Sequence, residues 1–284
     1  MQGGALLEKL IAGRWIAGVS TGDAIAAAKE FNRHGISGII NYLGEEISSE
    51  DEVESTVKKY ISIIDTISST HTSADISLKL SQLGQNIDES LARRSYKKIL
   101  SHASSRKVFV WLDMETYDKV EDTINIFLDI GRKGKSGICI QSYLKRSASD
   151  IKRLSEYGAI VRLVKGAYTA PYDIAYSSRE LTTKNYYALM DYLFRNSHKF
   201  TIATHDKDIT LKALRLNKWY RRDITHAMLK GIHNQYAVEL AKGGENVSIY
   251  IPFGEKWKEY AFRRISEGSN MHLVINSLFE NQKI

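Results

Sequence analysis

The sequence predicts an α/β fold in which eight parallel strands, each followed by a helix, close into a (β/α)8 TIM-type barrel. Short runs rich in Ile and Val alternate with polar stretches of helical composition, as expected of a parallel sheet with crossover helices. Eight such runs occur, and 284 residues suit a barrel of about 250 residues with an extension. No linker rich in Pro, Gly or Ser divides the chain. We therefore expect a single domain over residues 1–284.

The expected elements follow one another regularly along the chain. The strands are expected at residues 37–43, 76–81, 108–113, 137–141, 160–164, 200–204, 224–229 and 247–252. The helices are expected at residues 51–70, 85–103, 118–132, 148–157, 177–197, 207–217, 232–242, 256–267 and 269–282.

A helical extension precedes the first expected strand. Ser20 or Thr21 is a suitable N-cap, and Gly35 is a suitable stop. Residues 1–35 therefore form the extension, and residues 36–284 form the barrel. The rival architecture is an open doubly wound sheet, which usually carries a Gly-rich first turn, and the sequence has no G-x-G-x-x-G motif.

Composition narrows the classes of partner. The net charge of +7 and the isoelectric point of about 9.2 suit nucleic acid, a phosphate-bearing cofactor or an anionic membrane surface. Because the basic residues are scattered, we do not expect dedicated nucleic-acid binding. The dispersed histidines and the absence of a Cys pair give no support for a metal site.

The sequence also indicates a cytoplasmic protein. The single cysteine, Cys139, lies in an apolar run, which predicts a buried unreactive thiol and excludes an intrachain disulfide. No run of about 18 apolar residues occurs, so we expect at most peripheral contact with a membrane.

Polar side chains stand within or at the ends of five different expected strands: Lys79, Asp113, Gln141, Arg162 and His205. A barrel presents its catalytic groups at the C-terminal ends of its strands. A structural ion network is the alternative for any one of these residues. Together they predict a site, because burying each ion costs several kcal/mol unless it is well paired.

A second cluster lies in the expected helix at 256–267. Tyr260, Arg263, Arg264 and Glu267 fall on one stripe of this helix. A solvated face with an Arg263–Glu267 ion pair would explain the pattern. Two adjacent arginines beside a tyrosine also suit a carboxylate ligand, which a guanidinium group binds with two parallel hydrogen bonds.

The motifs resemble those of one enzyme family. The matching stretches are ISLKLSQLG, VWLDMET, GICIQSYLKRS, IVRLVKGAY, IATHDKDI and IYIPFGEKWKEYAFRRISEG, in the family's order, over about residues 76–279. The chain is thereby identified as a member of the flavin-dependent proline dehydrogenases, in the monofunctional form. RLVKGAY and the YxxRRxxE pattern carry most of the specificity.

The resemblance implies both a fold detail and a reaction. The last helix is expected over the barrel mouth, with FAD at the C-terminal ends of the strands. The family oxidises L-proline to Δ1-pyrroline-5-carboxylate by hydride transfer from C5 to flavin N5, and electrons pass to a quinone or another acceptor. A separate pyrroline-5-carboxylate dehydrogenase would then oxidise the product.

Roles follow from the resemblance, residue by residue. Asp113 and Arg162 match catalytic positions, with Arg162 next to flavin N5. The residues that match substrate contacts are Lys79, Arg263, Arg264, Tyr250, Tyr260, Leu229 and Tyr168. Those that match cofactor contacts are Ile140, Gln141, Arg162, Val164, Lys165, Gly166, Ala167, Lys184, Thr204, His205 and Glu267. The chain departs from many relatives at Thr169, at residues 225–227 and at Gly268.

Three alternatives stay open at this point. Hydroxyproline could be the substrate, although Tyr260 would oppose it if its ring closes on the carbon that carries the hydroxyl. The chain could be a flavin-free barrel that acts as a basic binding module. It could also be an aldolase-like barrel in which Lys79 or Lys165 forms a Schiff base.

Overall fold

The chain folds into a closed barrel of parallel strands. The computed structural model describes residues 13–44, 47–133, 135–258 and 260. Its strands pair in chain order from β1 to β8, and β8 pairs with β1. The predicted barrel is confirmed, because this last pairing leaves no open edge. The strands are β1 (Ser37–Tyr42), β2 (Ala74–Leu78), β3 (Val110–Leu112), β4 (Ser136–Gln141), β5 (Ile160–Val164), β6 (Lys199–Ala203), β7 (Asp223–Leu229) and β8 (Val247–Phe253).

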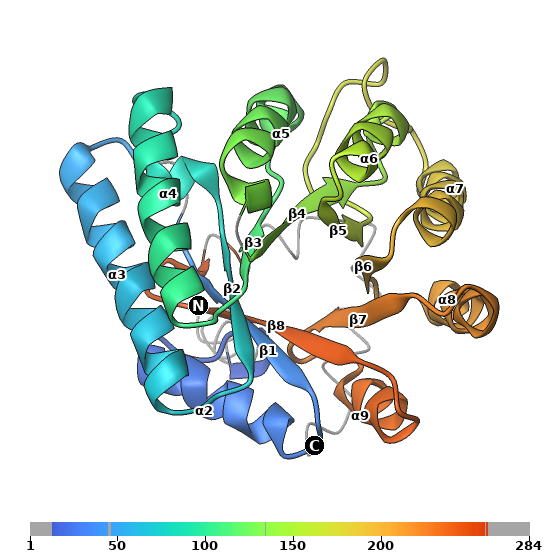
Figure 1. Ribbon diagram of the computed structural model, residues 1–284, viewed down its shortest axis with the longest axis horizontal. Helices are drawn as coiled ribbons and strands as arrows, with labels where there is room; N and C mark the ends of the chain where they lie inside the picture. The colour runs from blue at the N-terminus through green and yellow to red at the C-terminus, as the bar shows by residue number, and fades with distance from the viewer. Residues whose placement is uncertain (1–12, 45–46, 134, 259, 261–284) are drawn as a thin grey trace, which may run out of the picture.

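Helices surround the barrel and connect successive strands (Figure 1). The α-helices that lie wholly within the described residues are α2 (Thr21–Asn32), α3 (Glu50–Ser69), α4 (Glu89–Ser105), α5 (Val120–Asp129), α6 (Ser147–Glu156), α7 (Arg179–Asn196), α8 (Lys207–Tyr220) and α9 (Asn234–Lys242). Short 3-10 turns are η1 (Leu80–Leu83), η2 (Tyr117–Lys119) and η3 (Gly131–Lys133). The helices predicted at 256–267 and 269–282 fall largely or wholly outside the described residues, as does the expected position of the last helix over the mouth.

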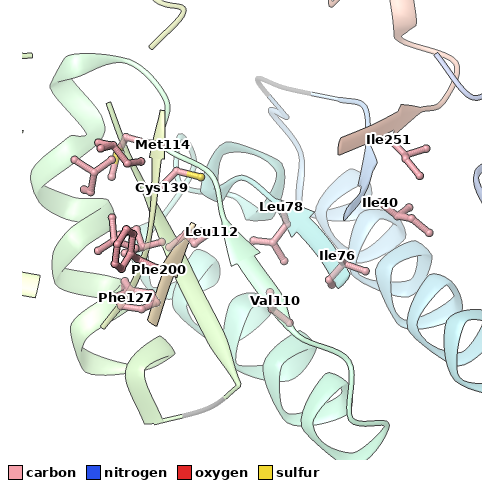
Figure 2. Close-up of a cluster of buried hydrophobic side chains, with 14 of the residues drawn as sticks. Ile40, Ile76, Leu78, Val110, Leu112, Met114, Phe127, Cys139, Phe200 and Ile251 are labelled. Atoms are coloured by element: carbon pink, nitrogen blue, oxygen red, sulfur yellow. The ribbon is translucent and has the colours of Figure 1, made fainter. Parts of the chain in front are cut away.

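Alternation along the strands separates two layers of side chains. Outward-facing residues such as Ile40, Ile76 and Val110 are completely or almost completely buried between strands and helices, where Phe127 of α5 joins them (Figure 2). The inward-facing set is different in character, because it includes Trp111 together with the charged groups described below. Apolar burial outside the barrel therefore stabilises the fold, while the interior is free to carry polar groups.

The strand that contains the predicted Lys79 ends earlier than the sequence indicates. β2 was expected to run to Ser81 but stops at Leu78, and η1 follows. Ser81 therefore does not continue the inward row of Ser77 and Lys79. Its hydroxyl instead donates to Glu115 at 2.5 Å. The alternation rule holds only while the backbone stays in the sheet.

The N-terminal extension contains the predicted capped helix. Ser20 caps α2: its Oγ accepts from the N–H of Asp23, and the Asp23 carboxylate accepts from the N–H of Ser20. α2 lies against β1 and β8. In a regular barrel this place belongs to the helix that follows the last strand.

A short segment in front of α2, residues 13–18, crosses the C-terminal ends of β7 and β8. The N–H of Ala17 donates to the carbonyl of Pro252 at 2.9 Å, and the N–H of Gly254 donates to the carbonyl of Gly18 at 3.1 Å. Lys230 Nζ donates to the carbonyl of Arg14 at 2.8 Å. The segment is therefore fixed over one side of the barrel mouth.

Among the helices of the described residues, none combines the length and the apolar character needed to cross a membrane.

Candidate active site

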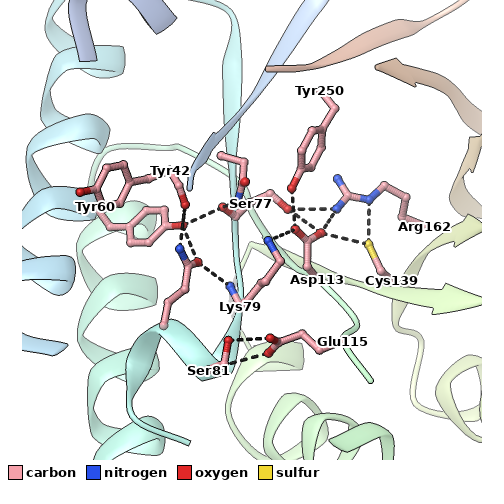
Figure 3. Close-up of polar contacts among 12 residues, drawn as sticks. Tyr42, Tyr60, Ser77, Lys79, Ser81, Asp113, Glu115, Cys139, Arg162 and Tyr250 are labelled. Atoms are coloured by element: carbon pink, nitrogen blue, oxygen red, sulfur yellow. Dashed lines mark hydrogen bonds and ion pairs between the residues drawn. The ribbon is translucent and has the colours of Figure 1, made fainter. Parts of the chain in front are cut away.

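A buried ion pair stands at the centre of the site, between Arg162 on β5 and Asp113 just beyond β3. Arg162 Nη2 donates to Asp113 Oδ1, and both groups bond to Ser77 of β2 (Figure 3). Ser77 Oγ accepts from Arg162 Nη2 at 3.0 Å and donates to Asp113 Oδ1 at 2.9 Å. Arg162 is 3% exposed and Asp113 is 8% exposed, so each needs the other's charge.

The other oxygen of Asp113 is contacted from β8 and from the residue just beyond β2. Tyr250 of β8 donates its hydroxyl to Oδ2 at 2.7 Å, and Lys79 Nζ lies 3.8 Å from the same oxygen. Burial raises the pKa of the Asp113 carboxyl, but the charges of Arg162 and Lys79 and the hydrogen bonds from Tyr250 and Ser77 together more than offset this, and its pKa is lowered overall. Asp113 is therefore ionised at neutral pH.

Cys139 lies on β4, between the two strands that carry the ion pair. Its Sγ accepts from Arg162 Nε at 2.8 Å. Burial raises the pKa of the Cys139 thiol to about 12, although the guanidinium beside it favours the thiolate. The thiol is buried, as predicted, and protonated at neutral pH. The sequence did not indicate that it would contact Arg162.

Two aromatic rings flank the guanidinium of Arg162. Its Cζ lies 4.8 Å from the ring centroid of Trp111 and 5.5 Å from that of Tyr250. Cation–π contacts of this kind favour the charged form in a buried site. Together with the bonds to Asp113 and Cys139, they fix the plane of the guanidinium.

A second buried carboxylate supports the neighbouring strand ends. Glu115 accepts from both the N–H and the hydroxyl of Ser81, and burial raises the pKa of its carboxyl. The side chain of Gln141 donates to the main-chain carbonyl of Glu115 at 2.8 Å. Gln141 is thus held in place by the turn that follows β3.

Part of this network lines a cavity of about 520 Å³ at the C-terminal ends of the strands, to which Cys139 also contributes. The volume is in the range typical of small-molecule sites. The predicted site residues that line it are Lys79, Asp113, Gln141, Arg162, Val164, Lys165, Gly166, Ala167, Tyr168, Thr204, His205, Leu229, Tyr250 and Tyr260.

Other predicted site residues stand elsewhere. Ile140 is buried in the layer between barrel and helices, and Lys184 is exposed on α7; neither side chain lines the cavity. Arg263, Arg264 and Glu267 lie outside the described residues.

The strand β5 continues into an irregular stretch that forms one wall of the cavity. Lys165 Nζ makes an ion pair with Asp206 Oδ2 at 2.8 Å, and Asp206 also caps α8. Gly166 has φ +106°, and a Cβ there would lie 2.2 Å from the ring of Tyr143. A glycine is required at this position by both conformation and space.

Several cavity residues were missed by the sequence reasoning: Trp15, Cys139, Arg179, Asp206, Ala227 and His233. Asp206 follows His205 directly and could have been found as part of the same strand end. Trp15 comes from the N-terminal segment, and nothing in its local pattern indicates that this segment crosses the barrel mouth.

The fold and this charged cavity at its C-terminal face define a barrel enzyme of the kind that builds its active site from strand ends. The family model described as proline dehydrogenase matches residues 24–276. The chain therefore belongs to the proline dehydrogenase family.

Similar proteins agree with this assignment. Proline dehydrogenase 1 of Bacillus subtilis (strain 168) is 33% identical over 263 residues, which cover 91% of this chain and 87% of the relative. Proline dehydrogenase of Deinococcus radiodurans is 32% identical over 266 residues, covering 90% of this chain and 86% of the relative.

Solved structures share the fold. Proline utilization A from Bdellovibrio bacteriovorus aligns with a TM-score of 0.87 at 21% identity, over 99% of this chain and 35% of that chain. Proline utilization A from Corynebacterium freiburgense aligns with a TM-score of 0.80 at 20% identity, over 96% of this chain and 33% of that chain. The chain thus spans about a third of the length of these structures.

Proposed function

We propose that this chain is an FAD-dependent dehydrogenase that oxidises L-proline to Δ1-pyrroline-5-carboxylate. The observation that carries the proposal is the group of Lys79, Asp113 and Arg162 around one cavity, in a chain of the proline dehydrogenase family. Apolar residues at these strand ends would stabilise the fold about as well as three buried charges do. Binding of a ligand at this site would explain why the charges are present.

The residues fit a flavin. Arg162 lines the cavity, and its Nη1 is buried with no hydrogen-bond partner among the described residues, so a donor remains for a cofactor acceptor. In the wall formed by residues 164–167, Gly166 packs against the ring of Tyr143 so closely that a side chain would not fit. We assign the cofactor side of the cavity to this wall, Gln141, Thr204 and His205, with Ile140, Lys184 and Glu267 as further predicted contacts.

The chemistry that bound FAD would supply is the acceptance of a hydride from C5 of proline, and the two-electron oxidation would be balanced by loss of the proton on the ring nitrogen. The protein contributes orientation and charge. Arg162 is held as a fixed cation by Asp113, Ser77 and Cys139, and such preorganised charge stabilises negative charge that develops nearby.

The substrate side of the cavity is formed by other strand ends. Tyr250, Tyr260, Leu229 and Tyr168 line it and would pack around the pyrrolidine ring. Lys79 lines the same cavity, and we propose that it approaches the substrate carboxylate. Arg263 and Arg264, which lie outside the described residues, are proposed to hold the same carboxylate.

The partners proposed are a quinone or another electron acceptor and, for the product, a separate pyrroline-5-carboxylate dehydrogenase. The aldehyde formed by ring opening of the product calls for an oxidation of that class. We place the protein in the cytoplasm with at most peripheral membrane contact. We also propose that residues 1–284 act as one domain, since the N-terminal segment and α2 both contact β8.

The test is the visible spectrum of the purified protein under argon, before and after addition of L-proline. Flavin bands that bleach on addition are expected. If the bands persist with proline but bleach with hydroxyproline, hydroxyproline would replace proline as the proposed substrate. If FAD does not bind even on reconstitution, the flavoenzyme proposal fails and the binding-module and Schiff-base readings return.

A further inference from the structure

The N-terminal segment brings a tryptophan into the cavity. Trp15 lines the cavity although it lies more than 60 residues before Lys79, the first charged residue of the site in chain order. It also precedes the stretch that the family model matches, which begins at residue 24. None of the site roles considered above includes it.

The segment is fixed in place by contacts with the ends of β7 and β8. Lys230 Nζ donates to the carbonyl of Arg14 at 2.8 Å, and Arg14 Nε donates to the carbonyl of Gly231 at 3.4 Å. A Cβ at Gly231 would lie 2.3 Å from the carbonyl oxygen of Arg14 and 2.9 Å from Trp15 Cδ1. The indole therefore lies directly against the turn after β7.

The indole N–H of Trp15 has no hydrogen-bond partner among the described residues, although the side chain is 1% exposed. A buried tryptophan N–H usually finds an acceptor, because leaving it unpaired is unfavourable. In a residue that lines a ligand cavity, the missing acceptor is most simply an atom of the ligand.

The position of Trp15 indicates that its ligand is the substrate and not the cofactor. The proposed cofactor contacts follow β4, β5 and β6, whereas the segment is bonded to the ends of β7 and β8. Its neighbour Ile16 packs in one apolar cluster with Tyr260 and Leu229, two proposed substrate contacts. Trp15 therefore enters from the substrate side.

We propose that Trp15 is a substrate-binding residue whose indole N–H donates a hydrogen bond to a carboxylate oxygen of the bound imino acid. This inference rests on the proposed function. It adds to that function a hydrogen-bond donor from the N-terminal segment. The substrate would then be contacted by Trp15, which precedes β1, and by Tyr250 on β8.

The experiment compares Trp15→Phe, which keeps an aromatic plane and removes the N–H, with Trp219→Phe as the matched control. Trp219 stands at the end of α8 and is 87% exposed, away from the cavity. Four quantities are measured in the FAD-loaded proteins: KM and kcat for L-proline, and the inhibition constants of cyclopentanecarboxylate and of pyrrolidine. The affinity for FAD is measured by titration of the apoprotein.

Trp15→Phe is expected to raise KM for proline and the inhibition constant of cyclopentanecarboxylate about tenfold, as for loss of a hydrogen bond to a charged group. Pyrrolidine, which has no carboxylate, should bind unchanged, as should FAD. Trp219→Phe should match the wild type throughout. Equal weakening of pyrrolidine, weakening of FAD alone, or no change in any constant would each overturn the assignment.

A second measurement needs neither turnover nor the Trp15→Phe variant. The protein has four tryptophans, so protein labelled with 15N-tryptophan gives four indole N–H resonances, which substitution of the other three assigns by elimination. The Trp15 resonance should shift downfield on addition of cyclopentanecarboxylate, and an unmoved resonance contradicts the proposal. If the wild type neither binds nor oxidises proline, the proposed function fails as well; if it does both and Trp15 is silent, only this inference fails.

Discussion

Arg162 on β5 reaches past β4 to bond with Asp113, and Cys139 of the intervening strand accepts from the same guanidinium. Three adjacent strands thus contribute to one buried network at the barrel's C-terminal end, with Ser77 of β2 as the fourth contributor. Contacts from several sides fix the position of this cation, which interrupts an otherwise apolar strand. Substitutions at different members of this network are therefore expected to change the stability of the fold by different amounts.

Asp113→Ala should destabilise the fold by about 3–5 kcal/mol, because it leaves Arg162 buried without a counterion. Asp113→Asn should cost less, since its amide oxygen still accepts from Ser77 or Tyr250. Urea unfolding of both variants measures the difference. Equal stability of the alanine variant and the wild type would show that the ion pair is not required for folding.

Cys139→Ala should destabilise by about 1–3 kcal/mol, because Arg162 Nε loses its acceptor, whereas Cys139→Ser keeps one. The thiol should also resist alkylation in the native protein at pH 8. With a pKa of about 12, only about one thiol in ten thousand is ionised there. Iodoacetamide followed by mass spectrometry checks this, with the guanidinium-unfolded chain as the control that must be labelled. Rapid labelling of folded protein would contradict the buried position.

The buried His226 predicts a loss of stability in acid. Burial lowers the pKa of its imidazole to about 4, and its ring lies near one carboxylate, that of Glu245, at 3.8 Å. Between pH 6.5 and 4 the unfolded chain binds a proton at this residue that the folded chain does not. The contribution of the neutral His226 imidazole to the free energy of unfolding is therefore fully present above pH 6.5. It is lost as the pH falls toward and through 4, by about 3 kcal/mol in all.

His226→Phe should remove this part of the pH dependence. Unfolding curves between pH 4 and 7 would show a shallower slope for the variant than for the wild type. An unchanged slope would assign the acid sensitivity to other groups.

Gly231→Ala should detach the N-terminal segment. Gly231 has φ +84°, and the added Cβ would meet the main chain at Arg14. The matched control is Gly158→Ala, because Gly158 has φ +68° and open space around its Cβ position. The control should lose only the conformational term of about 1–2 kcal/mol.

Trypsin provides the readout, because Arg14 is only 8% exposed in the wild type. Cleavage after Arg14 should be faster in Gly231→Ala than in either the wild type or Gly158→Ala. Similar cleavage in both glycine variants would mean that the clash is relieved without moving the segment.

Arg263→Ala and Arg264→Ala should each raise KM for proline strongly, if both hold the substrate carboxylate as the family resemblance implies. A lost charge-assisted bond of about 1.5–3 kcal/mol corresponds to a rise of roughly 10-fold to 150-fold. Steady-state kinetics measure the effect, with Arg221→Ala at the exposed end of α8 as the control. An unchanged KM would remove the arginine from the substrate site.

The sequence by itself determined the barrel and most of its wall. Each strand is a short apolar run whose outward residues must be buried under helices, so the eight strands can be identified locally. The positions of Lys79, Asp113 and Arg162 followed as well, because parallel strands in a barrel bring their C-terminal ends to one face. Strand ends were less certain, as Ser81 shows, since a 3-10 turn and one more strand residue look alike in sequence.

Only the tertiary structure decided which partner each polar group takes. Cys139 reads as an apolar residue in its run, yet it accepts from Arg162, because neighbouring parallel strands place the two residues side by side. Trp15 reads as part of a helical extension, yet it reaches the cavity, because bonds to Lys230 and Gly231, more than 200 residues away, carry its segment across the mouth. Local periodicity specifies which face of an element is buried, but contacts between distant segments depend on how the whole barrel closes.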